Sequence, residues 1–264
     1  MKIKDNLFSD TYQDGADSKR HRRGRSAKVL KREHAGSGNS GVDRINLMTQ
    51  EPHYTTIEPS SMNRNDWNER YAAQELLWGA EPNRFLADEL REVSPRGRAL
   101  DLACGEGRNA IWLAQLGWVV TAVDYSDVAL DRARRLAAEQ RVDVEWIETD
   151  VTGFVPAAGA FQLVIIAYLQ LPETGRRAVL AHAASALGPG GTLFMVGHAR
   201  LNLVEGVGGP RQPEVLWEPS EIRREVATLG LTLQRAEHVR RPVETPEGVK
   251  DAIDTVLRAE RAAI

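Results

Sequence analysis

Residues 98–109, RALDLACGEGRN, constrain this chain more than any other stretch, because an apolar run leads directly into two closely spaced glycines. The small and apolar residues of 99–103 predict a buried strand, and Gly105 and Gly107 predict a tight turn. The run AIWLA at 110–114 then predicts a helix. A strand, a glycine turn and a helix in this order allow a ligand to approach bare backbone above the edge of a sheet.

The charges around this turn separate two kinds of ligand. A dinucleotide brings a pyrophosphate and favours a third glycine, but the third position here is Ala110. Asp101 precedes the turn and Glu106 lies within it, and both acids repel a pyrophosphate. They suit a cofactor with an ammonium and a sulfonium group, as S-adenosylmethionine has. A tight turn without a ligand, in another kind of α/β protein, remains an alternative at this point.

The chain from residue 63 onward alternates predicted helices and strands. We expect helices over 65–78 (with Asn65 or Asp66 as N-cap), 83–93, 109–116, 127–140 (with Ser126 as N-cap), 173–187 and 219–229. We expect strands over 99–103, 118–123, 142–149, 161–166, 192–196, 231–239 and 252–257. A long loop over 199–218 and a connection over 241–248 complete the prediction. Such alternation is typical of a parallel sheet with helices on both faces.

Residues 1–61 differ from the rest, since they are polar and show no sustained apolar period. They hold eleven Lys and Arg against eight Asp and Glu, with a basic run over 19–25. We predict a disordered basic tail over 1–61 and a folded domain over 62–264, because the tail has too little apolar surface to offset chain entropy. The basic run suggests contact with nucleic acid, but we favour a solvated tail, or sequence upstream of a start at Met48 or Met62.

The remaining composition bears on location and partners. A single cysteine, Cys104, excludes an intramolecular disulfide and fits a reducing compartment, so we expect a cytoplasmic protein. No signal peptide is predicted, and no apolar run approaches the roughly 20 residues that a membrane-spanning helix needs. We expect no membrane partner and no metal, and either a monomer or a homodimer.

Acidic residues follow the second and third predicted strands. Asp124 lies at the tip of the second strand, where a carboxylate accepts hydrogen bonds from both ribose hydroxyls of a nucleotide. This role serves NAD and S-adenosylmethionine alike. Asp150 and Val151 follow the third strand, where a carboxylate beside a backbone N–H reads the edge of an adenine. Helix capping is the alternative for Asp150.

Four sequence marks, in this order, resemble those of class I S-adenosylmethionine-dependent methyltransferases. They are LDLACGEGRN at 100–109, VDYS at 123–126, DV at 150–151 and LGPGG at 187–191. The resemblance covers residues 63–264. The GEGRN wording, with Trp67 and WGAEP at 78–82, is similar to the small-molecule branch that includes tellurite-resistance-type and thiopurine-type enzymes.

The resemblance implies a Rossmann-like α/β fold, with a seven-stranded sheet of order 3-2-1-4-5-7-6 in which strand 7 is antiparallel. It implies S-adenosylmethionine as cofactor, with the glycine turn at its methionine end, Asp124 at the ribose and Asp150 at the adenine. The candidate cofactor residues are Asp101, Ala103, Gly105, Gly107, Arg108, Asn109, Asp124, Tyr125, Asp150, Val151, Ala167 and Trp78. Relatives often begin the fourth strand with Phe-Asp, whereas this chain has Gln162; we take that acid as structural.

The same resemblance implies methyl transfer by direct displacement to a small-molecule acceptor with a sulfur, oxygen or chalcogen nucleophile. Ala167 and Tyr168 would line the transfer site. Tyr168 and His198 are the candidate general bases, and a hydrogen-bonded loop residue is the alternative for His198. Cys104 is expected to pack. Nucleic acid is a poor acceptor, because the folded part is acidic and 167–172 lacks the motif of amino-methylating enzymes. A non-catalytic S-adenosylmethionine-binding sensor and a dinucleotide-dependent oxidoreductase stay open.

Overall fold

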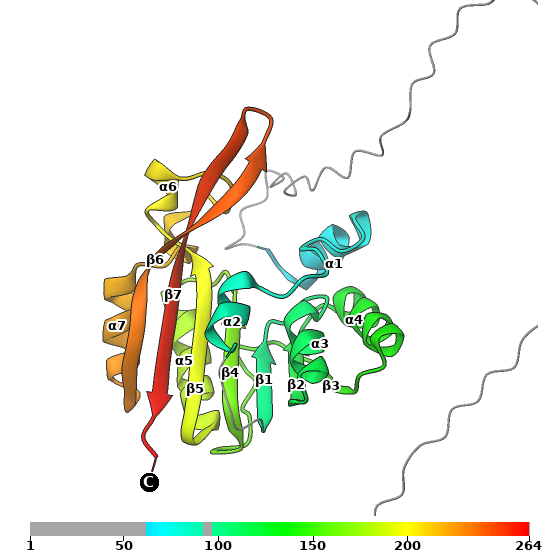
Figure 1. Ribbon diagram of the computed structural model, residues 1–264, viewed down its shortest axis with the longest axis vertical. Coiled ribbons are helices and arrows are strands. Elements are labelled where there is room, and N and C mark those ends of the chain that lie inside the picture. The colour runs from blue at the N-terminus through cyan, green and yellow to red at the C-terminus, as the bar shows by residue number, and fades with distance from the viewer. Residues whose placement is uncertain (1–61, 92–96, 264) are drawn as a thin grey trace, which may run out of the picture. The chain divides into compact units, whose positions relative to one another are not determined.

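The computed structural model of the chain describes residues 62–91 and 97–263 (Figure 1). The tail predicted over 1–61 therefore lies outside the described residues, as does the predicted end of the second helix at 93. In the ranges that are described, no helix is long and apolar enough to cross a membrane.

A seven-stranded sheet of order β3-β2-β1-β4-β5-β7-β6 forms the centre of the fold, as predicted (Figure 1). β1 pairs in parallel with β2 and β4, which continue in parallel to β3 and β5, whereas β7 is antiparallel to both β5 and β6. The strands are β1 (Arg98–Leu102), β2 (Val119–Asp124), β3 (Val144–Glu148), β4 (Phe161–Ala167), β5 (Leu187–His198), β6 (Leu231–Thr245) and β7 (Gly248–Arg261).

Helices cover both faces of the sheet, and each face has its own hydrophobic core. They are α1 (Arg64–Ala73), α2 (Arg84–Glu89), α3 (Arg108–Gln115), α4 (Asp127–Gln140), α5 (Glu173–Ala186), α6 (Asn202–Glu205) and α7 (Pro219–Ala227). Leu163 and Ile165 of β4 pack with side chains from α2, α3 and α4, while Val164 and Ile166 pack with α5 and α7. Successive side chains point to opposite faces, so an uninterrupted apolar strand feeds both cores.

The first helix differs from its prediction at both ends. Asn63 is the N-cap, and its side chain accepts hydrogen bonds from the N–H groups of Asn65 (2.7 Å) and Asp66 (3.3 Å), so the predicted caps at 65 and 66 are wrong. Asp66 completes a capping box. α1 ends at Ala73, and Leu76 has a φ of +51°, which a helix does not accommodate. Trp78 therefore lies in a turn beyond the helix.

The C-terminal part holds more regular structure than predicted. The expected loop over 199–218 contains α6 and a short 3-10 helix, Pro213–Val215. β5 begins at Leu187, before the predicted strand, with an irregular register opposite β4. The predicted connection over 241–248 is also wrong, because β6 and β7 pair from Leu231–Arg261 to Thr245–Gly248 and extend past the end of β5 (Figure 1). Proline at 242 is tolerated because β6 is an edge strand.

Candidate functional site

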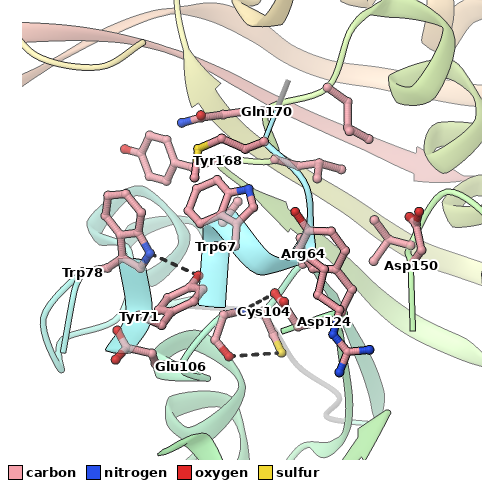
Figure 2. Close-up of a pocket in the computed structure, with 18 of the residues that line it drawn as sticks. Arg64, Trp67, Tyr71, Trp78, Cys104, Glu106, Asp124, Asp150, Tyr168 and Gln170 are labelled. Carbon is pink, nitrogen blue, oxygen red and sulfur yellow. Dashed lines mark hydrogen bonds between the residues drawn. The ribbon is translucent and has the colours of Figure 1, made fainter. Parts of the chain in front are cut away.

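A cavity of about 500 Å³ lies at the carboxyl ends of β1, β2 and β4, under α1 (Figure 2). β1 lies between β2 and β4, at the point where the strand order reverses. This switch point is the usual ligand position in an open α/β fold. The cavity is lined by Met62, Asn63, Arg64, Trp67, Tyr71, Trp78, Gly79, Ala103, Cys104, Gly105, Glu106, Arg108, Asn109, Asp124, Tyr125, Asp150, Val151, Thr152, Ala167, Tyr168, Leu169, Gln170, Leu171 and His198.

The glycine turn forms the floor of the cavity with bare backbone. Ala103 and Gly105 both have positive φ, +61° and +54°, so the chain bends sharply as it leaves β1. A Cβ atom on Gly105 would lie 2.7 Å from the Tyr71 hydroxyl oxygen, closer than carbon and oxygen approach without a shift. Only glycine therefore keeps both the bend and the packing of Tyr71 above it.

Gly107 serves the turn in a different way, since it does not line the cavity. Its φ is +79°, and a Cβ there would lie 2.5 Å from the Trp146 ring and 3.1 Å from the Ala133 methyl group. Gly107 thus allows the start of α3 to pack against α4 and β3. Its place in the motif is explained by this packing.

Asp124 lies at the tip of β2, as the sequence predicted, and its carboxylate is tied to the glycine turn. Oδ2 accepts from the N–H of Gly105 (2.8 Å) and Oδ1 from the N–H of Ser126 (2.9 Å). Burial raises the pKa of Asp124, and these backbone donors oppose the change. The Tyr125 N–H also interacts with this carboxylate. A carboxylate has about four lone-pair sites, so the group can still accept a hydrogen bond from a ligand in the cavity.

Asp101 lies behind the turn at 1% exposure, outside the cavity lining. Among the described residues, no donor meets either carboxylate oxygen with normal hydrogen-bond geometry. Burial, and next the nearby charge of Asp124, raise the pKa of Asp101 to about 7; Arg108 and the Ala110 N–H offset only part of this. The turn therefore contains a buried carboxyl group whose ionised form a nearby cation would stabilise.

Glu106 lines the cavity, but its charge is already paired. Its carboxylate forms a buried ion pair with Arg132 of α4. The same guanidinium donates to the carbonyl oxygens of Tyr71 (3.0 Å) and Gln74 (2.8 Å). Arg132 thus fixes the end of α1 to the glycine turn, and Glu106 adds less free negative charge to the site than the sequence suggested.

Three aromatic side chains cover the cavity from α1 and the turn after it (Figure 2). The ring centroid of Trp67 lies 5.9 Å from that of Tyr71 and 6.4 Å from that of Trp78. Trp78 Nε1 donates to the Tyr71 hydroxyl at 3.4 Å, and Arg108 donates to the Trp78 carbonyl oxygen at 2.7 Å. Arg108, the first residue of α3, therefore holds the aromatic cover in place.

The glycine turn and strand pattern are matched by a known family. Residues 99–191 match the family model described as "Methyltransferase domain". Over these residues the chain is similar to class I methyltransferases. The cofactor of class I methyltransferases is S-adenosylmethionine, and the residues present fit it: the floor is bare backbone, and among the described residues no donor meets the buried Asp101 carboxylate with normal hydrogen-bond geometry.

Relatives and solved structures agree with this family. The chain is 29% identical over 144 residues to a ubiquinone biosynthesis O-methyltransferase of Xanthomonas campestris, which covers 54% of this chain and 60% of the relative. It is 28% identical over 160 residues to glycine N-methyltransferase of Rattus norvegicus, 54% of each chain. The match thus spans little more than half the length of these relatives. The structure of TehB from Haemophilus influenzae has the same fold, with a TM-score of 0.58, 13% identity, and 75% and 66% of the two chains covered.

Most of the other predicted cofactor residues lie around the same cavity. Tyr125, Val151 and Ala167 line it. Asn109 also anchors α2, because its side-chain oxygen accepts from the N–H of Asn83 at 2.8 Å. Asp150 is exposed and accepts from the Thr152 N–H at 2.8 Å, so it shapes a turn; it caps no helix.

Cys104 lines the cavity and also packs into the core on the α2–α4 face of the sheet. Its thiol lies 3.7 Å from the Gly105 carbonyl oxygen. Burial, and next the charge of Asp124, raise the pKa of the Cys104 thiol well above its ordinary value. The side chain is therefore kept as a neutral thiol, which fits packing better than nucleophilic attack.

A polar network where β4 and β5 end, beside the middle of β7, was only partly found from the sequence. Tyr168 and His198 line the cavity as predicted. Behind them, Asp254 of β7 is fully buried, and Arg241 of β6 contacts it. Sequence analysis missed Asp254 and Arg241, although one signal was present: Asp254 is a lone acid inside the apolar run AIDTVL at 252–257.

Proposed function

We propose that this protein transfers a methyl group from S-adenosylmethionine to a small-molecule acceptor with a sulfur, oxygen or chalcogen nucleophile. The catalytic domain would span residues 62–264. The observation that carries the proposal is the covered cavity of about 500 Å³, since Trp67, Tyr71 and Trp78 leave room for a small acceptor beside a cofactor. Pockets of this size and apolar character are typical of small-molecule sites.

The positions of the lining residues support a definite arrangement of the cofactor. Asp124 would accept from the ribose hydroxyls, and Asp150 with the N–H of Val151 would bind the adenine. The backbone at Gly105 would hold the methionine end, with Asp101 stabilising its ammonium group from behind the turn. Ala167 and Tyr168 would then border the transferred methyl group and the acceptor.

When bound, S-adenosylmethionine supplies a methyl group on a sulfonium, which a nucleophile attacks by direct displacement. The protein's part is to hold the acceptor in line and to exclude water, and alignment alone supplies much of the rate in such a reaction. The aromatic cover suits both tasks. Its rings present large apolar faces to the acceptor, and Arg108 fixes them through the Trp78 carbonyl.

The names of two relatives indicate small acceptors, whereas a third is a ribosomal RNA methyltransferase. One is a ubiquinone biosynthesis O-methyltransferase and another a glycine N-methyltransferase, so the matched region occurs with both oxygen and nitrogen acceptors. Because the match covers only 60% and 54% of these relatives, their substrates are not transferred to this chain. The chemistry of the acceptor has to come from its own residues.

Calorimetry with S-adenosylmethionine, S-adenosylhomocysteine and NADH on the full chain tests the proposed cofactor. We expect binding of the first two ligands and none of NADH. Tight NADH binding without S-adenosylmethionine binding would overturn the proposal in favour of an oxidoreductase. Binding of S-adenosylmethionine without methylation of any acceptor in a panel of thiols, phenols and chalcogen oxyanions would favour a non-catalytic sensor.

A further inference from the structure

Four polar residues form a network at the edge of the cavity: Tyr168, directly after β4, and one residue each from β5, β6 and β7. Asp254 Oδ2 accepts from the Tyr168 hydroxyl at 2.9 Å and from Arg241 Nε at 3.0 Å. Asp254 Oδ1 lies 3.3 Å from His198 Nδ1. His198 and Asp254 are register partners across the antiparallel β5–β7 pair, so the sheet itself sets their separation.

Tyr168 is the weaker of the two candidate bases in this arrangement. Its hydroxyl proton is directed at Asp254, and burial, then the charge of Asp254, raise the pKa of Tyr168 above its ordinary value. The residue has a φ of +56°, a strained conformation for tyrosine. Its ring packs on His198, with centroids 4.8 Å apart. The Tyr168 ring thus orients the imidazole of His198 by packing against it.

Asp254 is suited to support a positive charge on His198. Burial acts to raise the pKa of Asp254, but the contacts with His198 and Arg241 outweigh it, and the pKa lies below its ordinary value. Asp254 is therefore an anion, fully buried, with one oxygen toward the Nδ1 edge of the imidazole. An anion at this position stabilises the Nδ1–H form of the neutral ring and the imidazolium that follows proton uptake.

We propose that His198 is the general base of this enzyme, that Asp254 is its positioning residue, and that the acceptor is a hydroxyl compound of phenolic type. The inference rests on the proposed methyl transfer. A thiolate or chalcogenide nucleophile is already ionised and needs no base, whereas a phenol carries a proton that must leave. A phenol also suits the aromatic cover of Trp67 and Trp78.

The proton and electron balance is simple. The acceptor oxygen forms a bond to the methyl carbon, the carbon–sulfur bond breaks, and its electron pair stays on sulfur. The hydroxyl proton passes to His198 Nε2, the ring nitrogen that does not face Asp254. One positive charge is lost at sulfur and one is gained at the imidazole, so no other reactant is required. Asp254 stays ionised throughout, while Arg241 balances part of its charge.

The first test needs no acceptor. Long-range proton–nitrogen NMR of the histidine rings, with His198→Gln used for assignment, reports which ring nitrogen of neutral His198 carries the proton. We expect Nδ1–H in the wild type and a larger share of Nε2–H in Asp254→Asn. An Nε2–H ring in the wild type, or the same tautomer in both proteins, would overturn the role of Asp254.

The second test is turnover with catechol and phenol, compared with thiophenol, which is largely ionised at mildly alkaline pH. We expect His198→Gln to lower kcat for the phenols by about 10²- to 10⁴-fold, with a loss at least tenfold smaller for thiophenol. Asp254→Asn should lower kcat in the same direction with little change in KM. His238→Gln removes a histidine outside the cavity lining and is the matched control.

Calorimetry of each variant with S-adenosylmethionine separates this inference from the proposed function. If no protein, wild type included, binds S-adenosylmethionine, the proposed function fails. If cofactor binding is intact and phenol turnover in His198→Gln equals that of the wild type, methyl transfer stands and the base assignment fails. If none of the compounds turns over, the tautomer measurement decides the role of Asp254.

Discussion

Replacing Asp101 with asparagine should make the cofactor-free protein more stable at alkaline pH. The folded chain holds this carboxyl at 1% exposure, and burial with the charge of Asp124 raises its pKa from 3.8 to about 7. Between about pH 4 and pH 7, the folded chain keeps a proton at Asp101 that the unfolded chain has released. Wild-type stability therefore falls as pH rises through this range.

The magnitude follows from the same pKa difference. At about 1.36 kcal/mol for each pKa unit, the rise from 3.8 to about 7 corresponds to roughly 4 kcal/mol. This is an upper value, because relaxation around a buried ionised group lowers its cost. Asparagine has the shape of the neutral acid and does not ionise. The free energy of unfolding of Asp101→Asn should therefore rise relative to that of the wild type up to about pH 7, and the difference should stay constant above it.

Urea unfolding followed by tryptophan fluorescence, at several values from about pH 5 to about pH 8.5, measures this difference. Asp131→Asn removes an exposed acid from α4 and is the matched control, which should follow the wild type. If the difference in unfolding free energy between the wild type and Asp101→Asn does not change with pH, the reasoning is refuted. The same variant should bind S-adenosylmethionine more weakly, because an asparagine side chain carries no negative charge to stabilise the ammonium group of the cofactor.

Three further substitutions test other parts of the site. Asp124→Ala should weaken S-adenosylmethionine binding by about 1–3 kcal/mol, measured by calorimetry, and unchanged affinity would remove Asp124 from the site. Gly107→Ala should destabilise the fold by about 1–3 kcal/mol in urea unfolding, because the new methyl group meets Trp146; a stability equal to wild type would show that the turn accommodates it. Arg132→Met leaves Glu106 buried without its partner and should lower the free energy of unfolding by about 3–5 kcal/mol. Proteolysis near Gln74 should also be faster. Protease resistance equal to that of the wild type would argue against the link between Arg132 and α1.

Local signals allowed the sequence to predict the centre of the fold. α4 begins after Ser126, whose hydroxyl accepts from the Ala129 N–H at 3.1 Å, and it spans the predicted 127–140. The cap, the apolar period and the helix end all lie within one segment of chain, so no distant contact was needed to find them. The strand order followed from the family resemblance, and the structure confirms it.

The errors occurred where distant residues decide the structure. α1 stops at Ala73, and Arg132 of α4 binds the carbonyl oxygens of Tyr71 and Gln74 at its end, which the local sequence does not reveal. The β6–β7 ribbon is longer than predicted because its two strands pair with each other, so charged residues and a proline remain in strand conformation.

In the candidate site too, residues with a local sequence signal were predicted and residues that depend on distant contacts were missed. The glycine turn and Asp124 were found because their spacing reflects one strand–turn–helix unit and the strand beside it. Asp254 was missed because its role depends on β7 lying antiparallel beside β5, which places it opposite His198. The sequence order of the two residues carries no sign of that pairing.

Methyl transfer is tested most directly with S-adenosylmethionine that carries a carbon-13 methyl group, using the full chain and a panel of phenols, thiols and chalcogen oxyanions. Mass spectrometry would identify any labelled product. We expect a small product with the label on a phenolic oxygen, and a loss of that product in His198→Gln. Binding of S-adenosylmethionine with no labelled small molecule anywhere in the panel would contradict this expectation.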